Sequence, residues 1–387
     1  MLNSILDNDL YKFTMQLAVI NLFPRAKVKY EFINRGKTKF PQGFDKLLKK
    51  EISKLSDLKL TKEEKFFFEN KCFYLPPTYF DFLSGYRYDP DEVEVSQQGN
   101  DLSVIIKGYW YRTILWEVPL MAIISELFFN ISKEKPWSEE KRKNVLMNKI
   151  ELFNSLDVPF ADFGTRRRYS LHNHDLVIST LKKNAKKFVG TSNVYLAMKH
   201  KTAPIGTHAH EWFMFHAAKY GFKMANKLAL ENWVKIFRGD LGIALSDTFT
   251  SDAFFMSFDT KLAKLFDGVR QDSGDPVEFG YKIIEHYKSL NIDPTTKTII
   301  FSDALDPYKV RELASEFKGK IRISFGIGTN LTNDVGIKPL NMVIKITEAL
   351  PEGRHWIPTV KISDSKGKYT GDGEMITIAK KIMDIED

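Results

Sequence analysis

Eight short apolar segments, each followed by polar or glycine residues, restrict the fold more than any other feature of this sequence. They lie near residues 158–163, 187–190, 203–206, 242–246, 267–270, 298–302, 321–325 and 342–346. Most intervals between them are long enough for a crossover helix, and strands that alternate with helices form a parallel sheet. The most economical arrangement of such units is a closed βα barrel. We therefore expect an irregular barrel of seven or eight strands over residues 156–346.

The polar residues that follow the strands predict a functional site. The motifs are Phe163-Gly164-Thr165-Arg166, Gly190-Thr191-Ser192-Asn193, Gly206-Thr207, Ser246-Asp247, Ser302-Asp303 and residues 270–275 and 326–330. Each motif alone is also explained as a turn or a helix cap. In a βα barrel, however, the carboxyl ends of the strands form the active face. Seven such motifs on one face favour a site built from strand-end loops.

The first 155 residues have a mixed pattern, which predicts a smaller N-terminal α/β domain. A helical stretch over residues 10–23 precedes a strand over residues 27–34. The segments 92–95 and 102–110 flank a turn and are typical of a β-hairpin.

The last segment, residues 347–387, is expected to return to the N-terminal domain and complete an α/β sandwich. It contains two strand-like pieces, at 356–362 and 368–370, around Ser365-Lys366-Gly367. A chain of 387 residues exceeds the size at which a single core usually keeps growing. A large barrel domain with a smaller domain beside it fits this length.

Composition bears on the cellular compartment. The single cysteine, Cys72, excludes an internal disulfide and is consistent with a reducing cytoplasm. The first nine residues do not resemble a signal peptide. No apolar stretch approaches the roughly 20 residues of a membrane-spanning helix. We therefore expect a cytoplasmic protein with no membrane partner.

The net charge of +8 is partly concentrated in clusters, of which Arg166-Arg167-Arg168 is the most informative. These arginines follow a predicted strand, and guanidinium groups bind phosphate in a bidentate manner. The alternative is surface charge. A nucleic-acid-binding protein would need a basic stripe lined by aromatic side chains, and this charge is too dilute over the chain to favour a nucleic-acid partner.

The glycine-spaced loop Gly326-Ile327-Gly328-Thr329-Asn330 follows the seventh predicted strand. Barrels commonly bind phosphate with the loops after their seventh and eighth strands, and bare backbone N–H groups can approach an anion closely. The loop lacks the sequence of a Walker loop and of a dinucleotide fingerprint. It predicts a phosphate site of another kind.

Asp272 and Asp303 follow predicted strands and are candidate ligands for Mg²⁺ or for ribose hydroxyls. Asp275 is followed by Pro276, a pattern that also indicates a helix N-cap.

His208 and His210 form a His-x-His pair at the expected start of a long helix over residues 210–237. A histidine there can bind a metal, move a proton or accept a phosphoryl group. The pair suggests a metal-dependent barrel hydrolase as an alternative function, although side chains two residues apart diverge on a helix. Asp247, on the neighbouring predicted strand, could fix the tautomer of His210.

Taken in order, the motifs resemble those of the nicotinate phosphoribosyltransferases, which join nicotinic acid to phosphoribosyl pyrophosphate in NAD synthesis. The matching segments are residues 9–15, 32–35, 162–168, 190–193, 209–213, 269–276, 361–364 and 371–372, which extend over nearly the whole chain. The resemblance implies an ATP-coupled ligase that gives nicotinate mononucleotide and pyrophosphate, uses Mg²⁺, and forms a homodimer with sites shared between subunits.

The resemblance also implies roles for individual residues. Phe163 would stack on the pyridine ring, with Tyr11 of the partner subunit on its other side. Arg270 would bind the substituent of the base, and Arg35 and Arg166 would bind phosphate or pyrophosphate. Asp272 and Asp303 would contact ribose or Mg²⁺, and the 5′-phosphate would bind to the loop that contains Gly326, Gly328, Thr329 and Asn330.

His210 aligns with the histidine that ATP phosphorylates in this family, and Asp247 with the aspartate that orients it. Together with Asp272 they form the expected catalytic group, whereas His208 is expected to take no part. Enzymes that use nicotinamide carry an acidic residue at the position of Ser192. An aspartate there would repel a carboxylate, so Ser192 favours nicotinate as the substrate.

Overall fold

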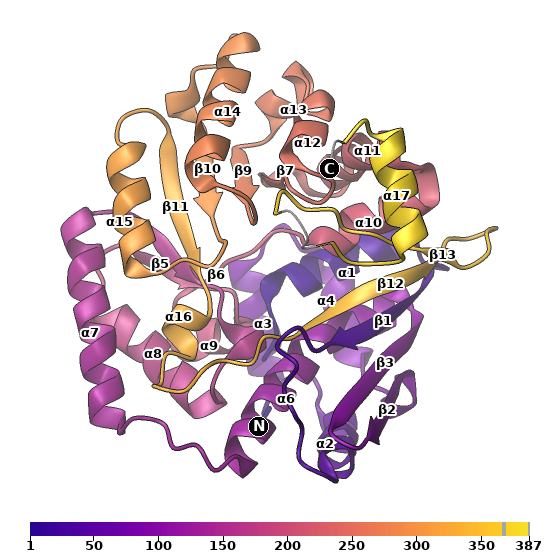
Figure 1. Ribbon diagram of the computed structural model, residues 1–387, viewed down its shortest axis with the longest axis vertical. Helices are drawn as coiled ribbons and strands as arrows, with labels where there is room; N and C mark the ends of the chain where they lie inside the picture. Colours follow the sequence, from indigo (N-terminus) through magenta and orange to yellow (C-terminus); the bar gives the residue numbers. More distant parts are fainter. Residues whose placement is uncertain (366–368, 386–387) are drawn as a thin grey trace.

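The computed structural model describes residues 1–365 and 369–385, and its larger sheet contains seven parallel strands in the order β6-β5-β4-β11-β10-β9-β8 (Figure 1). These strands are β4 (Phe160–Asp162), β5 (Phe188–Thr191), β6 (Ala203–Pro204), β8 (Ile243–Leu245), β9 (Gly268–Gln271), β10 (Thr298–Phe301) and β11 (Arg322–Ile327). Among the described residues no pairing joins the edge strands β6 and β8, so the barrel is open. The predicted βα barrel is confirmed with seven strands.

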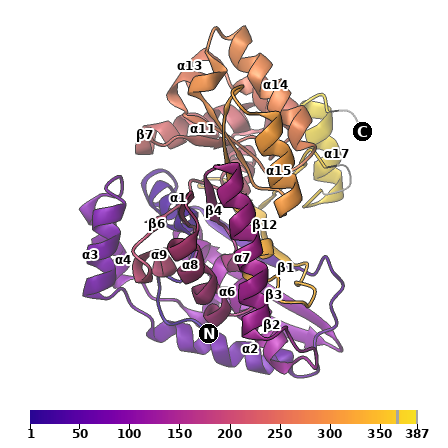
Figure 2. The same cartoon turned by 90° about the vertical axis from the view of Figure 1, so that its left-hand side faces the viewer.

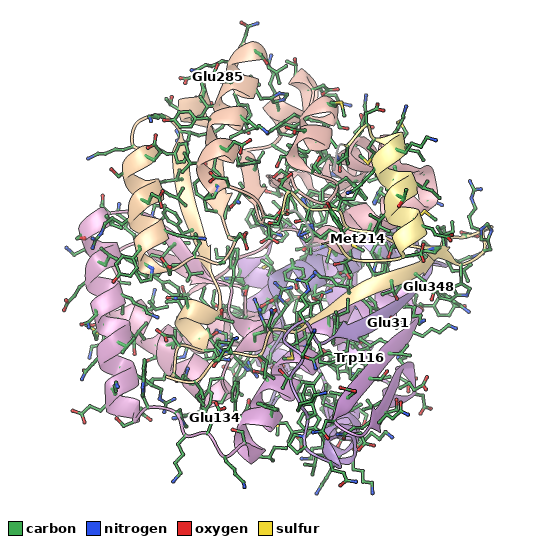
Figure 3. All side chains as sticks on the ribbon, in the orientation of Figure 1. Glu31, Trp116, Glu134, Met214, Glu285 and Glu348 are labelled. Carbon is green, nitrogen blue, oxygen red and sulfur yellow. The ribbon has the colours of Figure 1, made fainter. Side chains whose placement is uncertain are left out.

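The second sheet is antiparallel, with the order β13-β12-β1-β3-β2. Its strands are β1 (Lys27–Ile33), β2 (Val93–Gln98), β3 (Asp101–Tyr109), β12 (Val343–Leu350) and β13 (Ile357–Pro358). The predicted hairpin is formed by β2 and β3. Lys29 in β1 forms ion pairs with Glu31 and with Glu348 of β12, and Figure 3 labels these two glutamates on neighbouring strands.

The strand predicted near residues 342–346 does not belong to the barrel, which corrects that prediction. It is part of β12, which pairs antiparallel with β1. Its side chains alternate between buried and partly exposed positions, as expected for a sheet with one covered face. β9, in contrast, is mostly buried along its length. The domain boundaries drawn after residues 155 and 346 stay predictions.

Helices of the N-terminal region lie around the antiparallel sheet and at its junction with the barrel, except for the last of them, which packs against helices of the barrel (Figure 1). They are α1 (Leu10–Leu22), α2 (Phe44–Ser53), α3 (Lys62–Lys71), α4 (Pro77–Gly85), α5 (Trp110–Thr113), α6 (Glu117–Ile131) and α7 (Glu139–Leu156). The start of α3 is fixed by a capping box between Thr61 and Glu64.

The remaining helices mostly connect the barrel strands, and Figure 2 shows α13, α14 and α15 above the antiparallel strands. They are α8 (Leu171–Asn184), α9 (Val194–Lys199), α10 (His210–Tyr220), α11 (Phe222–Phe237), α12 (Ser251–Ser257), α13 (Thr260–Leu265), α14 (Pro276–Ser289), α15 (Pro307–Glu316), α16 (Thr329–Thr332) and α17 (Gly373–Ile382). A short strand-like segment, β7 (Arg238–Leu241), follows α11.

The helix predicted over residues 210–237 is two helices. Gly221 has φ +85°, which L side chains rarely adopt, and its N–H donates to the carbonyl of Ala217 at the end of α10. α11 begins immediately afterwards, at Phe222.

One apolar helical segment is longer than expected from the sequence, from which no stretch of membrane-spanning length was predicted. Trp110–Ile131 has 22 residues and contains an 18-residue window with a mean hydropathy of 1.6, which is enough by length and composition to cross a membrane. The fold buries 78% of this window, as expected for a core helix. The earlier statement that no stretch approaches membrane length is therefore wrong.

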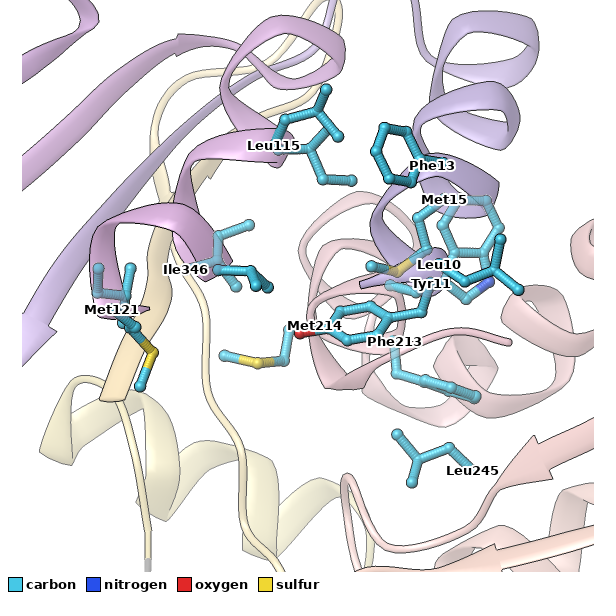
Figure 4. Close-up of a cluster of buried hydrophobic side chains, with 14 of the residues drawn as sticks. Leu10, Tyr11, Phe13, Met15, Leu115, Met121, Phe213, Met214, Leu245 and Ile346 are labelled. Atoms are coloured by element: carbon cyan, nitrogen blue, oxygen red, sulfur yellow. The ribbon is translucent and has the colours of Figure 1, made fainter. Parts of the chain in front are cut away.

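The two sheets share one hydrophobic core. Figure 4 shows part of it, where Tyr11 of α1 lies beside Met214 of α10, with Ile346 of β12 in the same cluster. The predicted return of the C-terminal segment to the N-terminal domain applies to β13, which pairs with β12, whereas the N–H of Ile362 donates to the carbonyl of Thr248 and α17 packs against α11 of the barrel domain. Of the second predicted strand, residue 368 and the turn residues 366–367 lie outside the described residues, and Thr370 forms a bridge with Lys361.

Candidate active site

His210 is the first residue of α10 and lies at the carboxyl end of the barrel strands. Its Nδ1 is 3.0 Å from the hydroxyl of Thr248, and its Nε2 is 3.0 Å from Oδ2 of Asp272. The Nζ of Lys361 is also 3.0 Å from Nε2. Both ring nitrogens therefore have polar partners, and Nε2 faces a donor and an acceptor at once.

The environment of His210 favours a neutral imidazole. Burial and the charge of Lys361 lower its pKa to about 4, against the opposing effect of Asp247 and Asp272. Burial would raise the pKa of Asp272, but its contact with the His210 ring and the charge of Arg270 keep it well below its usual value. At neutral pH the site thus combines an uncharged imidazole with an ionised carboxylate.

Asp247 lies next to His210 but does not hydrogen-bond to its ring, which corrects the predicted direct contact. Its Oδ1 is 3.9 Å from Nε2, while its Oδ2 accepts a hydrogen bond from Ser273. Lys361 Nζ is 3.4 Å from that Oδ2. Asp247 therefore acts on His210 through its charge and through Lys361, and Thr248 and Asp272 make the direct contacts.

His208 is a structural residue, as expected. It is fully buried between Phe213 and Trp233, and its Nε2 accepts a hydrogen bond from the N–H of Leu245. Burial lowers its pKa well below the usual value. Its ring shares no ligand position with His210, so the alternative of a hydrolase that uses the His208/His210 pair is wrong.

A metal site centred on His210 is also disfavoured. His210, Asp247 and Asp272 can each offer one ligand atom within 4.8 Å of the others. The ammonium of Lys361, however, contacts His210 and pairs with Asp247. A cation already in this position opposes a second one.

A group of cations lies beside this centre. Burial and the charge of Arg166 lower the pKa of Arg35, and burial with the charges of Arg166 and Arg35 lowers the pKa of Arg167 to about 10. Burial lowers the pKa of Lys345 to about 8, with Arg166 and Lys361 acting in the same direction against Glu117. Cations that depress each other's pKa are close together, and a bound anion would relieve their repulsion.

The three consecutive arginines do not act together. Arg166 is 3.4 Å from Glu117 and, with Arg167, belongs to the cationic group. Arg168 is fully buried and makes two hydrogen bonds, of 2.6 and 2.8 Å, to the carboxylate of Asp7. The idea that all three arginines surround a phosphate is therefore wrong, because Arg168 links the barrel to the N-terminus.

The glycine loop follows the seventh strand of the sheet in chain order, as predicted. Gly326, however, lies against the ring of Phe163 and leaves space for it. A Cβ at position 326 would lie 2.3 Å from Cε2 of Phe163. Gly328, Thr329 and Asn330 form the turn into α16, and Lys149 donates to the carbonyl of Asn330. The Oδ1 of Asn330 is buried and has no hydrogen-bond partner among the described residues.

Tyr11 lies beside Arg166 of its own chain, and the predicted stacking of the partner subunit's Tyr11 on the base stays a prediction. The N–H of Leu10 donates to the carbonyl of Ser192 at 2.8 Å, and the Ser192 hydroxyl donates to Asp9 at 2.7 Å. These bonds dock α1 onto the end of β5. Burial and the charge of Glu117 raise the pKa of Tyr11, against the opposing charge of Arg166.

Arg270 and Asp303 lie at the carboxyl ends of neighbouring strands. Arg270 is in β9, and its buried Nε has no hydrogen-bond partner among the described residues. Asp303 follows β10 and is half-buried. Ser302, beside it, donates to Oδ1 of Asp272 at 2.8 Å.

Several site residues were not predicted from the sequence. Lys345 lies in β12, on the face opposite to the buried Ile344 and Ile346, and this alternation was visible in the sequence. Lys361 and Thr248 lie in loops, and nothing in their local sequence indicated that they contact His210.

An open barrel with buried titratable groups and cations at the carboxyl ends of its strands is the arrangement of an α/β barrel enzyme. Residues 158–386 match the model of the nicotinate phosphoribosyltransferase family, and residues 6–125 match the model of its N-terminal domain. The chain belongs to the nicotinate phosphoribosyltransferase family.

Individual relatives resemble the chain over its full length. The nicotinate phosphoribosyltransferase of Chromohalobacter salexigens is 57% identical, over 99% of this chain and 98% of that protein. That of Desulforapulum autotrophicum is 52% identical, over 99% of both. The crystal structure of the Porphyromonas gingivalis enzyme covers 100% of both chains, with a TM-score of 0.97 and 44% identity.

Proposed function

We propose that this enzyme transfers the phosphoribosyl group of phosphoribosyl pyrophosphate to nicotinate, giving nicotinate mononucleotide and pyrophosphate for NAD biosynthesis. The observation that carries the proposal is the group formed by Arg35, Arg166, Arg167 and Lys345 beside Asp272. Its charge suits a substrate with several phosphates. The aromatic ring of Phe163 lies at the end of β4, where a flat heterocycle can stack.

The chemistry needs positioned charges rather than a general base. The ring nitrogen of nicotinate attacks the ribosyl carbon as pyrophosphate leaves, and negative charge builds on the departing group. Cations at that place stabilise the transition state more than the ground state. Arg270 would bind the nicotinate carboxylate, and the loop of Gly328, Thr329 and Asn330 would bind the 5′-phosphate.

The residues present also fit Mg²⁺. Asp272 and Asp303, with the hydroxyl of Ser302 between them in the sequence, offer the oxygen ligands that this ion prefers. Bound there, Mg²⁺ would neutralise charge on the pyrophosphate. Asp272 would also hold the ribose and His210, so it has both a binding and a catalytic role.

We also propose that ATP phosphorylates His210, which makes the enzyme an ATP-coupled ligase. The support is the chemical state of this residue: a neutral imidazole at a helix N-terminus, where a phosphoryl group is favoured. Asp247 and Asp272 would orient and polarise the ring.

The preference for nicotinate over nicotinamide now depends mainly on Arg270. Ser192 remains near the site, but its hydroxyl is 2.7 Å from the buried carboxylate of Asp9. Burial raises the pKa of Asp9. The acidic side chain of Asp9 therefore lies beside Ser192 whatever residue 192 contributes. A guanidinium, that of Arg270, is needed to favour nicotinate over nicotinamide.

The test is pyrophosphate release with nicotinate or nicotinamide, with and without ATP and Mg²⁺. We expect turnover of nicotinate, stimulation by ATP, loss of activity with a chelator and recovery with added Mg²⁺. Arg270→Gln should raise the KM for nicotinate, with Arg270→Lys as the charge-retaining control. Efficient use of the amide without use of the acid would refute the substrate assignment.

Assembly and compartment are further proposals: a cytoplasmic homodimer. Because one chain holds both Tyr11 and Arg166, an isolated subunit would already contain these parts of the site. Light scattering at assay concentrations, together with specific activity over a dilution series, measures whether dimerisation is needed for turnover.

A further inference from the structure

The C-terminal segment places one lysine on the ring of the proposed phosphoryl acceptor. Lys361 Nζ is 3.0 Å from Nε2 of His210 and 3.4 Å from Oδ2 of Asp247. Its side chain is 11% exposed. A buried ammonium pays a desolvation cost unless it is paired, and Asp247 supplies the pairing charge.

The ammonium and Asp272 compete for the same nitrogen. Lys361 can only donate, so it needs the lone pair of Nε2, whereas ionised Asp272 can only accept and needs a proton there. The hydroxyl of Thr248 accommodates either tautomer, since it can accept from Nδ1–H or donate to bare Nδ1. Lys361 therefore favours the tautomer with a free lone pair on Nε2.

We propose that Lys361 is a catalytic residue for the phosphorylation of His210: it holds the Nε2 lone pair in place and then neutralises the incoming phosphoryl group. This inference rests on the proposed function, in which ATP phosphorylates His210. The lone pair of Nε2 forms a bond to the γ-phosphorus as the bond from that phosphorus to the bridging oxygen breaks. ADP leaves with the electron pair, and the Nδ1 proton stays on the ring, donated to Thr248.

The flexible lysine side chain moves in this step from the lone pair to an oxygen of the transferred phosphoryl group. Phosphorylation adds negative charge near Asp247 and Asp272, and the ammonium offsets that charge. The charged groups that face the ring are these two carboxylates and Lys361, while the adjacent Glu211 is paired with Lys12. Lys361 is the cation nearest to Nε2 in the part of the chain that the structure describes.

The experiment measures acid-labile phosphate incorporated from ATP labelled at the γ-phosphate, with Lys361→Met, Lys361→Arg and His210→Ala. Lys320→Met, at an exposed lysine paired with Glu316, is the matched control. Loss of one positioned charge should slow labelling roughly 100-fold in Lys361→Met.

Lys361→Arg keeps a positive charge at this position, so it should retain measurable labelling. Thermal unfolding of each variant shows whether it is folded, and the arginine variant tests the proposal if the methionine variant is not. Labelling of folded Lys361→Met at the wild-type rate, or the absence of labelling in folded Lys361→Arg, would overturn the role of Lys361.

Phosphorylation of His210 and the role of Lys361 in it can be tested separately. If His210→Ala is still labelled, the phosphohistidine assignment under the proposed function is wrong. If His210→Ala loses the label while Lys361→Met keeps it at the wild-type rate, only the role of Lys361 is wrong.

Discussion

The ring of Phe163 occupies the space that a side chain at position 326 would need, with only 2.3 Å between its Cε2 and a Cβ placed on Gly326. The glycine of a predicted phosphate loop therefore also shapes the surface on which the base is proposed to stack. Gly326 links two binding functions, because a change there moves the aromatic ring before it affects any phosphate contact.

Gly326→Ala should displace Phe163 and weaken the binding of nicotinate. Loss of aromatic stacking costs about 0.5–1.5 kcal/mol, which corresponds to a rise of roughly 2- to 10-fold in the KM for nicotinate. Gly373→Ala is the control, because a Cβ there meets nothing within 4 Å. An unchanged KM in Gly326→Ala would mean that Phe163 does not contact the base.

The adjacent residues Arg167 and Arg168 should respond oppositely to substitution by methionine. Arg167→Met removes a cation whose pKa burial and its neighbours Arg166 and Arg35 lower to about 10. The variant should therefore unfold at a temperature equal to or above the wild-type value, yet bind phosphoribosyl pyrophosphate less tightly. Calorimetric titration with this substrate and thermal unfolding measure the two effects.

Arg168→Met leaves the buried carboxylate of Asp7 without its partner. Breaking such a pair costs about 3–5 kcal/mol, and urea unfolding should show that loss. The contrast fails if Arg168→Met unfolds like the wild type, or if Arg167→Met alone is strongly destabilised.

Lys12 joins three helices through a buried ion triad, in which its Nζ is 2.5 Å from Glu117 and 2.7 Å from Glu211. Lys12→Met should cost about 3–5 kcal/mol, because Glu211 loses its cation and Glu117 keeps only the longer contact with Arg166. Burial raises the pKa of Glu211, whereas Lys12 and other cations outweigh burial and lower that of Glu117 to about 2. Neutralisation by Glu211→Gln should therefore destabilise less than Glu117→Gln in urea unfolding. The reverse order would contradict this division of charge.

Buried histidines should make the protein less stable in acid. Burial lowers the pKa of His216 to about 3, although the carbonyl of Trp212 opposes the shift. The unfolded chain binds the proton near pH 6.5, so the contribution of a neutral His216 is complete above that pH and is lost as pH falls towards 3. Between pH 7 and about pH 5, one such histidine accounts for about 2 kcal/mol of lost stability.

His216→Gln should remove that part of the pH dependence, whatever its effect on stability at neutral pH. Urea unfolding at both pH values, for the variant and the wild type, isolates the difference. His172→Gln is the control, since this side chain is 75% exposed. Equal pH dependence in wild type and His216→Gln would show that His216 is not held neutral.

The barrel was predictable because its strands are short apolar segments whose ends carry polar residues, and a parallel sheet brings those ends to one edge. That reasoning placed Asp272 and Asp303 correctly, at the ends of β9 and β10. It misassigned β12, since an isolated apolar run does not show which sheet it will join. Side-chain pairing across long sequence separations, as between Lys361 and His210, leaves no periodic signal.

The same limit applied to Tyr11. The motif around it is visible in the sequence, but which residues of its own chain its side chain lies beside depends on the path of the chain. Arg168 was grouped with its neighbours because adjacent arginines look alike in a sequence, whereas a buried partner such as Asp7 becomes visible only in the fold.

An early segment, α1, and a late segment, around Lys361, both contribute to one site, and this has a consequence for synthesis. α1, which carries Tyr11, is made first, whereas Lys361 contacts His210 from a segment made 151 residues after that histidine. Because chains are made from the N-terminus, all seven barrel strands leave the ribosome before this lysine does. A nascent chain would therefore hold a formed barrel whose histidine still lacks its cation, and function would begin only after the last stretch has folded back.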